Sequence, residues 1–361
     1  LPDLVIRVGG TNGKGSVCAF LGGILQQTGH DVGVYTSPDL ERMNERIAVN
    51  GVVISDEDLY RHTRWLMHQD VELTFFEAMT AIALRHFAGM DAIILEVGMG
   101  GRCDATAAID ANLTVITNVS LEHTQHLGTS IEAIAGEISG AIMGSNVVTA
   151  CTEPALSIVA QEAARWNTTL YLVADDMWRQ TGPQRFTVTS DTRYELTTRL
   201  PGAYQGQNIA LAVKAAEVLS VPQASIVDGI ATAWLPGRME YIGTVLLDAA
   251  HNPAAMQALR VSLENMCVQP RCIVFGVMQD KDIPGIIAEL PQGDVIVTAA
   301  ATPRAASPTA VADLFRNMGR SCITAETPAS ALDEARELAG QDVILVTGSL
   351  RLVGNIRELL H

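Results

Sequence analysis

A glycine-rich turn between two apolar segments lies close to the start of the chain. Residues 4–8 predict a β-strand, the turn runs from Gly9 to Ser16, and residues 17–27 predict a helix. Glycines let consecutive backbone N–H groups converge on one point, and the helix N-terminus behind them adds a positive partial charge. This order of strand, turn and helix therefore predicts a phosphate-binding loop.

Lys14 supplies a mobile positive charge within this turn. In the standard phosphate loop, the lysine is followed directly by serine or threonine, whereas here Gly15 stands between Lys14 and Ser16. An ordinary glycine-rich turn is the alternative interpretation. The strand before the turn and the helix after it favour phosphate binding.

Length and charge limit what the chain can be. A chain of 361 residues exceeds the size at which one hydrophobic core stops growing, so two domains are expected. A net charge of −16 disfavours nucleic acid and anionic membrane as partners, because both require a basic surface. A nucleotide held by backbone amides, Mg²⁺ and a few cations remains compatible with this charge.

The six cysteines are scattered, without the paired spacing of a zinc site or a disulfide framework. We see no signal peptide and no apolar run of about 20 residues. We therefore expect a cytoplasmic protein with reduced thiols.

Polar side chains follow the predicted strands of the first half, where α/β folds place their ligand groups. Glu96 stands near the end of an apolar strand that begins at Ala92, just before a glycine cluster, and a buried carboxylate is costly unless a cation accompanies it. We interpret Glu96 as a Mg²⁺ ligand; a Glu that caps the next turn is the alternative. Other strand ends carry Ser37 and the group Glu122, His123 and His126, which could form a metal shell or be structural.

The remaining segments of the first half follow helical or alternating patterns. Residues 40–50 read either as a loop that closes over a substrate or as a plain surface loop. Residues 168–199 alternate over short segments and predict a small antiparallel sheet. Further strands are predicted over 31–36, 113–118 and 146–150, and helices over 55–69, 74–87, 131–143, 155–166, 209–219 and 224–233.

Proline and glycine near residue 237 mark a domain boundary, and a fresh alternation of strands and helices follows it. This alternation predicts a largely parallel sheet covered by helices on both faces. We place the boundary between domains 1–236 and 237–361 and expect a two-substrate site in a cleft between them. Strands are predicted over 244–248, 272–275, 295–298, 321–324 and 343–347, and helices over 253–266, 283–289, 308–318, 329–338 and the last residues.

Several motifs together resemble the folylpolyglutamate synthase/dihydrofolate synthase family, part of the Mur-ligase superfamily of ATP-dependent amide-bond-forming enzymes. The match runs in order along nearly the whole chain; the family's usual helical segment ahead of the first strand is not part of it. The motifs are the phosphate loop 10–16, Thr36-Ser37-Pro38, Phe75-Phe76-Glu77, 96–102, 123–128, 236–240, His251-Asn252-Pro253, Asp280-Lys281-Asp282 and 347–350.

The resemblance implies a fold, a reaction and its ligands. The fold would be α/β, with a phosphate-loop Mur-ligase-type central ATPase domain and a smaller Rossmann-like C-terminal domain that carries glutamate-ligase function. A substrate carboxylate would attack the γ-phosphate of ATP, and the amine of L-glutamate would then displace phosphate from the acyl phosphate. The partners would be ATP, Mg²⁺, L-glutamate and dihydropteroate or a folate, with no nucleic acid, no membrane, and a monomeric protein.

The resemblance also implies roles for particular residues. Lys14, His123, Arg238 and His251 would serve catalysis, and His251 and Ser349 would bind glutamate. Ser37 and Glu96 would bind the first Mg²⁺, and His123 a second ion. ATP would be bound by Gly10, Thr11, Asn12, Gly13, Lys14, Gly15, Ser16, Asn208, Arg238 and Asp248.

Two positions depart from the family's pattern. Ile138 stands where the family has a lysine that is carbamylated at the second Mg²⁺. Glu137 or Glu122 could supply the missing charge, the second ion could be weakly held, or activity could be reduced or lost; our hypothesis is the weakly held ion. Asp39 stands where the family usually has histidine, which changes the contacts expected of the substrate loop.

Three functions remain open on the sequence alone. The first is a ligase that adds L-glutamate to dihydropteroate, to the γ-carboxylate of (poly)glutamylated folates, or to both. The second is a Mur-type amide ligase with another carboxylate acceptor. The third is a nucleotide-binding pseudoenzyme, because Ile138 cannot carry a carbamate.

Overall fold

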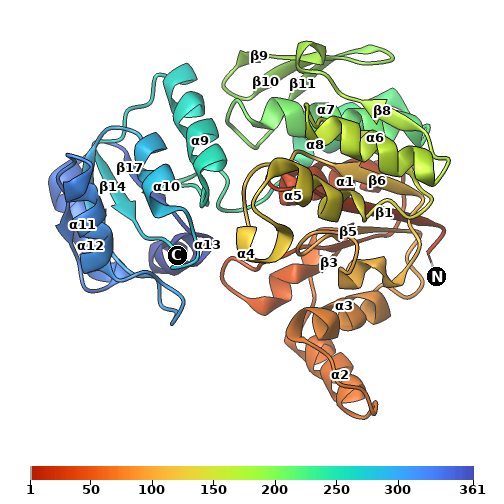
Figure 1. The fold of residues 1–361 in the computed structure, drawn as a ribbon, viewed down its shortest axis with the longest axis horizontal. Helices are drawn as coiled ribbons and strands as arrows, with labels where there is room; N and C mark the ends of the chain where they lie inside the picture. Colours follow the sequence, from red (N-terminus) through yellow and green to blue (C-terminus); the bar gives the residue numbers. More distant parts are fainter. Residues whose placement is uncertain (1) are drawn as a thin grey trace. The chain divides into compact units, whose positions relative to one another are not determined.

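The computed structural model describes residues 2–361 and divides the chain into two compact units (Figure 1). The first unit runs to Arg199 and includes Gln205–Trp234; the second comprises Leu200–Tyr204 and Leu235–His361. Each unit contains its own mainly parallel sheet between helices. The predicted α/β fold class is therefore confirmed.

The first unit is built on an eight-stranded sheet of order β4-β3-β2-β5-β1-β6-β7-β8. Its strands are parallel except for β3 and β4, which form an antiparallel edge beside β2. The strands span Leu4–Gly9 (β1), Val32–Tyr35 (β2), Ile47–Val49 (β3), Val52–Val53 (β4), Ala92–Glu96 (β5), Leu113–Ile116 (β6), Asn146–Thr149 (β7) and Leu170–Leu172 (β8). In β5 and β6 every residue is buried, as expected for central parallel strands.

Helices cover both faces of this sheet. On one face α1 packs against β1, β2 and β5 and is itself covered by α7 and α8. On the other face lie α3, whose Ile82 and Ala83 pack against β1 and β5, and the pair α5 and α6. The helices span Lys14–Gln26 (α1), Asp56–Met67 (α2), Phe75–His86 (α3), Thr124–Leu127 (α4), Ile131–Ser139 (α5), Ala155–Arg165 (α6), Gln205–Val218 (α7) and Gln223–Thr232 (α8).

Two segments of the first unit differ from their predictions. Residues 40–50, predicted as a loop, contain the short 3-10 helix Met43–Arg46 and strand β3, because β3 pairs with β2. Residues 168–199 supply β8 to the main sheet before they form the predicted antiparallel sheet. That sheet consists of β9 (Trp178–Gly182), β10 (Arg185–Thr189) and β11 (Arg193–Thr197).

The second unit is built on a six-stranded sheet of order β12-β13-β17-β14-β15-β16. All its pairs are parallel except β12 with β13, an antiparallel edge that the sequence did not predict because β12 is short and partly exposed. The strands span Glu240–Ile242 (β12), Val245–Leu247 (β13), Cys272–Phe275 (β14), Asp294–Val297 (β15), Ile323–Thr324 (β16) and Ile344–Thr347 (β17).

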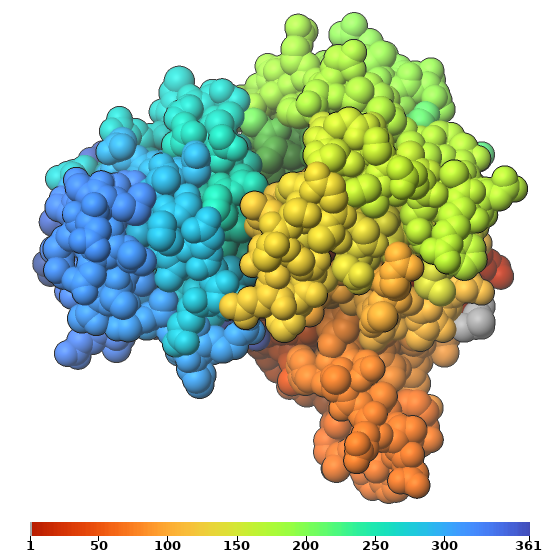
Figure 2. Space-filling model, in the orientation of Figure 1, coloured from red at the N-terminus to blue at the C-terminus, as the bar shows by residue number. Residues whose placement is uncertain are grey.

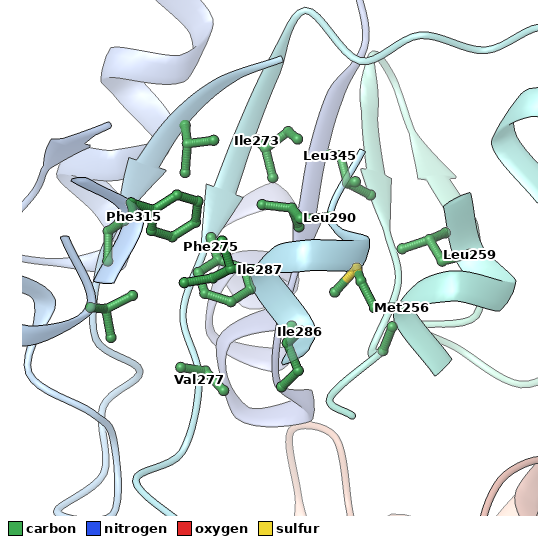
Figure 3. Packing of buried hydrophobic residues seen from close by; sticks show 14 of the residues in the cluster. Met256, Leu259, Ile273, Phe275, Val277, Ile286, Ile287, Leu290, Phe315 and Leu345 are labelled. Carbon is green, nitrogen blue, oxygen red and sulfur yellow. The ribbon is translucent and has the colours of Figure 1, made fainter. Parts of the chain in front are cut away.

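The core of the second unit lies between its sheet and three helices (Figure 3). Phe275 and Leu345 point from the strands toward Met256, Ile286 and Phe315 on the helices, and the rings of Phe275 and Phe315 meet edge to face. Two more helices, α12 and α13, contact β14 and β17. The helices span Pro253–Asn265 (α9), Ile283–Glu289 (α10), Pro308–Asn317 (α11), Pro328–Ala339 (α12) and Leu350–Leu360 (α13).

Helix α2 packs on α3 and projects from the body of the first unit (orange in Figures 1 and 2). Both begin with side-chain caps: Ser55 accepts the N–H of Asp58, and Thr74 and Glu77 form a capping box. Across residues 2–361, no helix is both long and apolar enough to cross a membrane.

Candidate active site

The glycine-rich turn between β1 and α1 has the backbone shape of an anion-binding loop. Gly10 and Gly13 have φ angles of 123° and 88°, which L side chains rarely adopt. A Cβ atom at Gly13 would lie 2.3 Å from Asn208 Oδ1, and one at Gly10 would lie 2.1 Å from Thr117 Oγ1. These two positions therefore require glycine.

Lys14 is the first residue of α1, and its side chain folds back over the loop. Its Nζ atom donates to the carbonyl oxygens of Gly10 and Thr11, at 2.9 and 3.0 Å. The first N–H groups of a helix have no acceptor within the helix, and the first turn of α1 contains no acidic residue. Together these features make the loop suitable for phosphate.

Residues after β6 hold the phosphate loop in place. Asn118 accepts the N–H of Thr11 through its carbonyl oxygen and the N–H of Asn12 through its side chain, and Thr117 Oγ1 donates to Asn12 O. Thr117 and Asn118 were not predicted as site residues. Their place at the carboxyl end of a buried strand was the signal that could have found them.

Asn208 on α7 lies against this loop from the other side. It is buried, and its Nδ2 atom donates to Gln205 Oε1 at 2.9 Å. Gln205 Nε2 in turn donates to Ser16 Oγ at 3.3 Å. The α7 residues therefore support the loop, and the adenine contact expected of Asn208 stays a prediction.

Glu96 and Ser37 lie together, as their expected metal-binding role requires. Glu96 is the last residue of β5 and Ser37 follows the adjacent parallel strand β2, and Glu96 Oε2 accepts the N–H of Ser37 at 3.0 Å. Glu96 is only 4% exposed, so its charge is removed from water. Carboxylate and hydroxyl oxygens are the hard ligands that Mg²⁺ prefers.

A cavity of about 20 Å³ adjoins the phosphate loop. That volume is close to the space that one water molecule occupies. The cavity is lined by Gly10, Thr11, Lys14, Val97, Gly98, Met99, Gly100, Glu122, His123, Leu127 and Ile138. The structure thus brings Lys14 and His123 to one cavity, with Glu122 the acidic residue in its lining and Ile138 a hydrocarbon part of its wall.

The donor set around the phosphate loop fits Mg²⁺ that is bound together with a nucleotide. Within residues 2–361, three or more His, Cys, Asp or Glu side chains do not converge on one metal-binding point. Mg²⁺ typically takes one or two carboxylates and completes its shell with water and phosphate oxygens, so Ser37 and Glu96 suffice for a first ion. His126, predicted beside His123, is exposed and is absent from the cavity lining.

In the second unit, Arg238 lies on a turn that a buried carboxylate organises. Asp248, after β13, accepts the N–H of Met239 at 3.1 Å and the hydroxyl of Tyr204 at 2.9 Å. Burial raises the pKa of Asp248, and the nearby positive charge of Arg238 opposes that shift. Glu240 accepts the N–H of Gly237 and pairs with Arg357, which fixes the other end of the turn.

His251 and Ser349 also follow strands of the second unit. His251 Nδ1 lies 2.9 Å from the carbonyl oxygen of Ala249, which can only accept, so Nδ1 carries the hydrogen. Ser349 caps α13 by accepting the N–H of Leu352 at 3.2 Å, and its own hydroxyl hydrogen remains available for donation. β13 and β17, which precede these residues, are adjacent and parallel.

Asp39 stands where the family that the chain resembles usually has histidine. Its side chain is buried in an ion pair. Its Oδ1 atom lies 2.7 Å from Arg46 Nε, and the Arg46 guanidinium lies over the ring of Phe75 at 5.1 Å. The carboxylate of Glu45 accepts the N–H groups of three preceding residues, 40–42. These contacts fix the segment 39–46, and its closure over a substrate stays a prediction.

Comparison with known proteins identifies both units. The model of the Mur ligase middle domain matches residues 8–216, and that of the Mur ligase, glutamate ligase domain matches residues 237–350. Dihydrofolate synthase/folylpolyglutamate synthase of Bacillus subtilis is 34% identical, with 99% of this chain and 91% of that protein covered. The chain belongs to the folylpolyglutamate synthase/dihydrofolate synthase family.

Two further members of the synthase family show how much of a relative the chain spans. A probable bifunctional folylpolyglutamate synthase/dihydropteroate synthase of Haloferax volcanii is 36% identical over 98% of this chain, which spans only 45% of that protein. The Escherichia coli protein solved in complex with DHPP and ADP is 31% identical with a TM-score of 0.90; 99% of this chain and 89% of that one are covered.

Membership of the synthase family confirms the expectation of an ATP-dependent ligase of the Mur type. It also confirms ATP and a divalent metal ion as the expected cofactors. The family's phosphate loop corresponds here to Gly10–Ser16, which the geometry supports independently. The roles expected of the individual site residues remain predictions.

Proposed function

We propose that this chain is an ATP-dependent ligase that attaches L-glutamate to dihydropteroate, to the γ-carboxylate of (poly)glutamylated folates, or to both. The observation that carries the proposal is the cavity at the phosphate loop, which Lys14, Glu122 and His123 line together. Ser37 and Glu96 lie paired at the ends of adjacent strands of the same sheet. The complex of the Escherichia coli relative with DHPP and ADP supports the choice of acceptor and nucleotide.

The reaction first joins two anions, the acceptor carboxylate and the γ-phosphate of ATP, and only then adds the glutamate amine. The acceptor carboxylate attacks the γ-phosphorus of ATP, and the bond between that phosphorus and the β,γ-bridging oxygen breaks. The products of this step are ADP and an acyl phosphate. The glutamate amine then attacks the acyl carbon, loses a proton and expels inorganic phosphate. Positioning and cancellation of negative charge supply most of the catalysis in such phosphoryl transfers.

Residues of the first unit act on the phosphates in this proposal. Lys14 and the amides of Gly10–Ser16 hold the phosphate oxygens, and Lys14 neutralises charge that develops during transfer. Ser37 and Glu96 would hold Mg²⁺, which when bound supplies charge cancellation on the phosphates. Asn208 would face the adenine.

Residues of the second unit act on ATP and glutamate. Arg238 contributes a second positive charge toward phosphate, and its turn is held by Asp248, which we assign to the ribose. His251 is assigned to the glutamate ammonium through Nε2, the ring nitrogen that does not contact the carbonyl oxygen of Ala249. Ser349 is assigned to the glutamate carboxylate through its hydroxyl hydrogen.

We propose that a second metal ion is weakly held. His123 contributes one nitrogen at the cavity, while Ile138 offers only hydrocarbon where the family has a carbamylated lysine. Glu122 lines the same cavity and Glu137 does not, so Glu122 is the carboxylate that could partly compensate. A crystal structure with nucleotide and Mg²⁺ tests this; a fully occupied second ion bound by a protein oxygen near residue 138 would contradict it.

We assign the ATP-binding function to residues 1–236 and the glutamate-ligase function to residues 237–361, and we propose a monomeric, cytoplasmic protein. The boundary agrees with the start of the matched glutamate ligase domain at residue 237. The compact units differ only in assigning Leu200–Tyr204 to the second unit and in placing the boundary before Leu235.

Release of ADP and phosphate tests the proposed function. The purified chain is mixed with Mg²⁺, ATP and L-glutamate, and dihydropteroate or a reduced folate is added separately. Acceptor-dependent release with a mass gain of one glutamyl unit is the expected result. Nucleotide binding without turnover would indicate a pseudoenzyme, and turnover only with another carboxylate would indicate a different Mur-type ligase.

A further inference from the structure

Arg7 is an arginine buried inside the sheet of the first unit. It lies in β1, three residues before the phosphate loop begins, and its exposed fraction is 0%. Its guanidinium donates to three backbone carbonyl oxygens: Ala141 at 2.9 Å, Thr106 at 3.0 Å, and Ile109. Because burying a charge costs several kcal/mol, these three contacts call for a physical explanation.

The hydrogen bond from Arg7 to Ala141 connects Arg7 to one part of the cavity wall. Ala141 follows the last turn of α5, and Ile138 in that turn lines the cavity. The glycine segment 98–101 packs tightly on the same turn, since a Cβ atom at Gly101 would lie 2.6 Å from Ile138 O. Arg102 adds a backbone hydrogen bond to Glu137 O at 3.3 Å.

The hydrogen bond from Arg7 to Thr106 connects Arg7, by way of Asp104, to the other part of the cavity wall. Asp104 Oδ1 accepts the N–H and the hydroxyl of Thr106, whose carbonyl oxygen accepts from Arg7. Asp104 Oδ2 accepts the N–H groups of Gly98 and Met99, which line the cavity, at 3.0 and 3.2 Å. Hydrogen bonds thus run from Arg7 to both walls of the cavity.

We propose that Arg7 is a positioning residue that fixes the separation between the glycine segment 98–101 and the last turn of α5, and thereby the shape of the small cavity beside the phosphate loop. The proposal rests on the proposed function to the extent that this cavity holds the metal ion that accompanies the nucleotide phosphates. It requires no particular acceptor substrate. A charged guanidinium suits this position because its planar, fixed fork of donors reaches several carbonyl oxygens at once.

The test compares R7M and R7K with R320M, a matched control. Arg320 lies in the second unit and also donates to three backbone carbonyl oxygens, those of Ile287, Leu290 and Pro291. Calorimetry measures the affinity for ADP with Mg²⁺ and for ADP with a chelator. Hydrogen exchange measures the protection of amides 98–101 and 137–141.

We expect R7M and R7K to weaken the binding of ADP with Mg²⁺ roughly 10- to 100-fold, the range found for residues that orient metal ligands. Binding of ADP without metal should change by less than about threefold, and amides 98–101 should lose protection. R320M should leave all three readouts unchanged. Equal losses of affinity with and without metal, or unchanged protection of 98–101, would mean that Arg7 is merely structural and would overturn the proposal.

D104N provides a second route if R7M does not fold. It leaves Arg7 in place and removes an acceptor charge from the same network, so it should produce the same selective loss of metal-dependent ADP binding. The combined variant R7K/D104N should be non-additive, because both changes act through Thr106. Additive effects would overturn the proposal. A wild-type chain that binds ADP with Mg²⁺ but never ligates glutamate would refute the proposed function alone.

Discussion

At the scale of single residues, the phosphate loop depends on glycines that no other residue can replace. Gly13 and Gly29 have nearly equal φ angles, 88° and 85°. A methyl group added at Gly29 would have nothing within 4 Å, whereas one added at Gly13 would collide with Asn208. A comparison of alanine substitutions at Gly13 and Gly29 therefore separates the stability cost of backbone strain from the stability cost of a collision.

We predict that G29A costs about 1 kcal/mol of folding stability from its φ angle alone. G13A should cost more than G29A and should also weaken ADP binding, because Asn208 has to move away from the loop. Denaturant unfolding and calorimetry measure the two effects. Equal ADP affinity in G13A and G29A would show that the fit between Gly13 and Asn208 is not needed for binding.

Residues that are proposed to bind ligands through their own side chains were predicted from the sequence, and residues that hold the loops through their neighbours were not. Lys14, Glu96 and His123 each carry the chemistry that their position suggests, so the sequence pointed to them. Asn118 and Asp104 hold the loops through backbone N–H groups that lie close only after folding. Their partners are far away or unremarkable in the sequence, so no local pattern indicated them.

At the scale of elements, buried central strands were predicted closely, whereas β3 and β12, toward the sheet edges, were not; the edge strand β16 lies within the strand predicted over 321–324. The bounds of β14 and α10 agree with the sequence analysis, because apolar runs flanked by polar residues mark both. β12 is a three-residue edge strand, and β3 is a three-residue strand between β2 and the edge strand β4, so both depend on partner strands. Their short, mixed sequences resemble loops.

The contact between α2 and α3 contains a pH-sensitive pair of histidines. Arg85 Nε donates to His62 Nδ1 at 3.2 Å, so His62 Nε2 carries the hydrogen and donates to His86 Nδ1 at 3.3 Å. Burial, mainly, lowers the pKa of both rings below their ordinary 6.5; Arg61 opposes protonation of both, and Asp58 favours it. The folded state therefore prefers both rings neutral.

We predict that the free energy of unfolding of the first unit decreases as the pH falls below about 6.5, because the unfolded chain binds these protons first. The loss continues until the pH has passed the lowered pKa values of the folded state. H62Q should flatten this dependence in urea unfolding curves. H68Q, on the exposed side of the same helix, should keep it, and an unchanged slope in H62Q would contradict the assignment.

At the scale of the whole molecule, two units with separate sheets and cores are proposed to serve one reaction. A proline and glycine turn followed by a new alternation of strands and helices predicted a boundary near residue 237, and the compact units divide before Leu235. The assignment of Leu200–Tyr204 to the second unit was not predicted, because it depends on contacts such as that of Tyr204 with Asp248.

We predict that Arg238, a residue of the second unit, contributes to ATP affinity. R238M should weaken binding of a non-hydrolysable ATP analogue by roughly 10- to 100-fold, the value of a hydrogen bond to a charged group. R271M removes an exposed arginine of the same unit that pairs with Asp294, and should bind as the wild type does. Unchanged affinity of R238M for the ATP analogue would contradict the proposal that the second unit takes part in nucleotide binding.

The most direct test of the account is the glutamate- and folate-dependent release of ADP by K14M beside K214M. Lys214 pairs with Asp191 and Glu217 in the first unit, so K214M removes an equal charge from a structural ion pair. We predict that K14M folds and loses about 10²- to 10³-fold in kcat, the size of a lost charge-stabilising donor, while K214M retains turnover. Wild-type turnover in a folded K14M would contradict the claim that this loop binds and activates ATP.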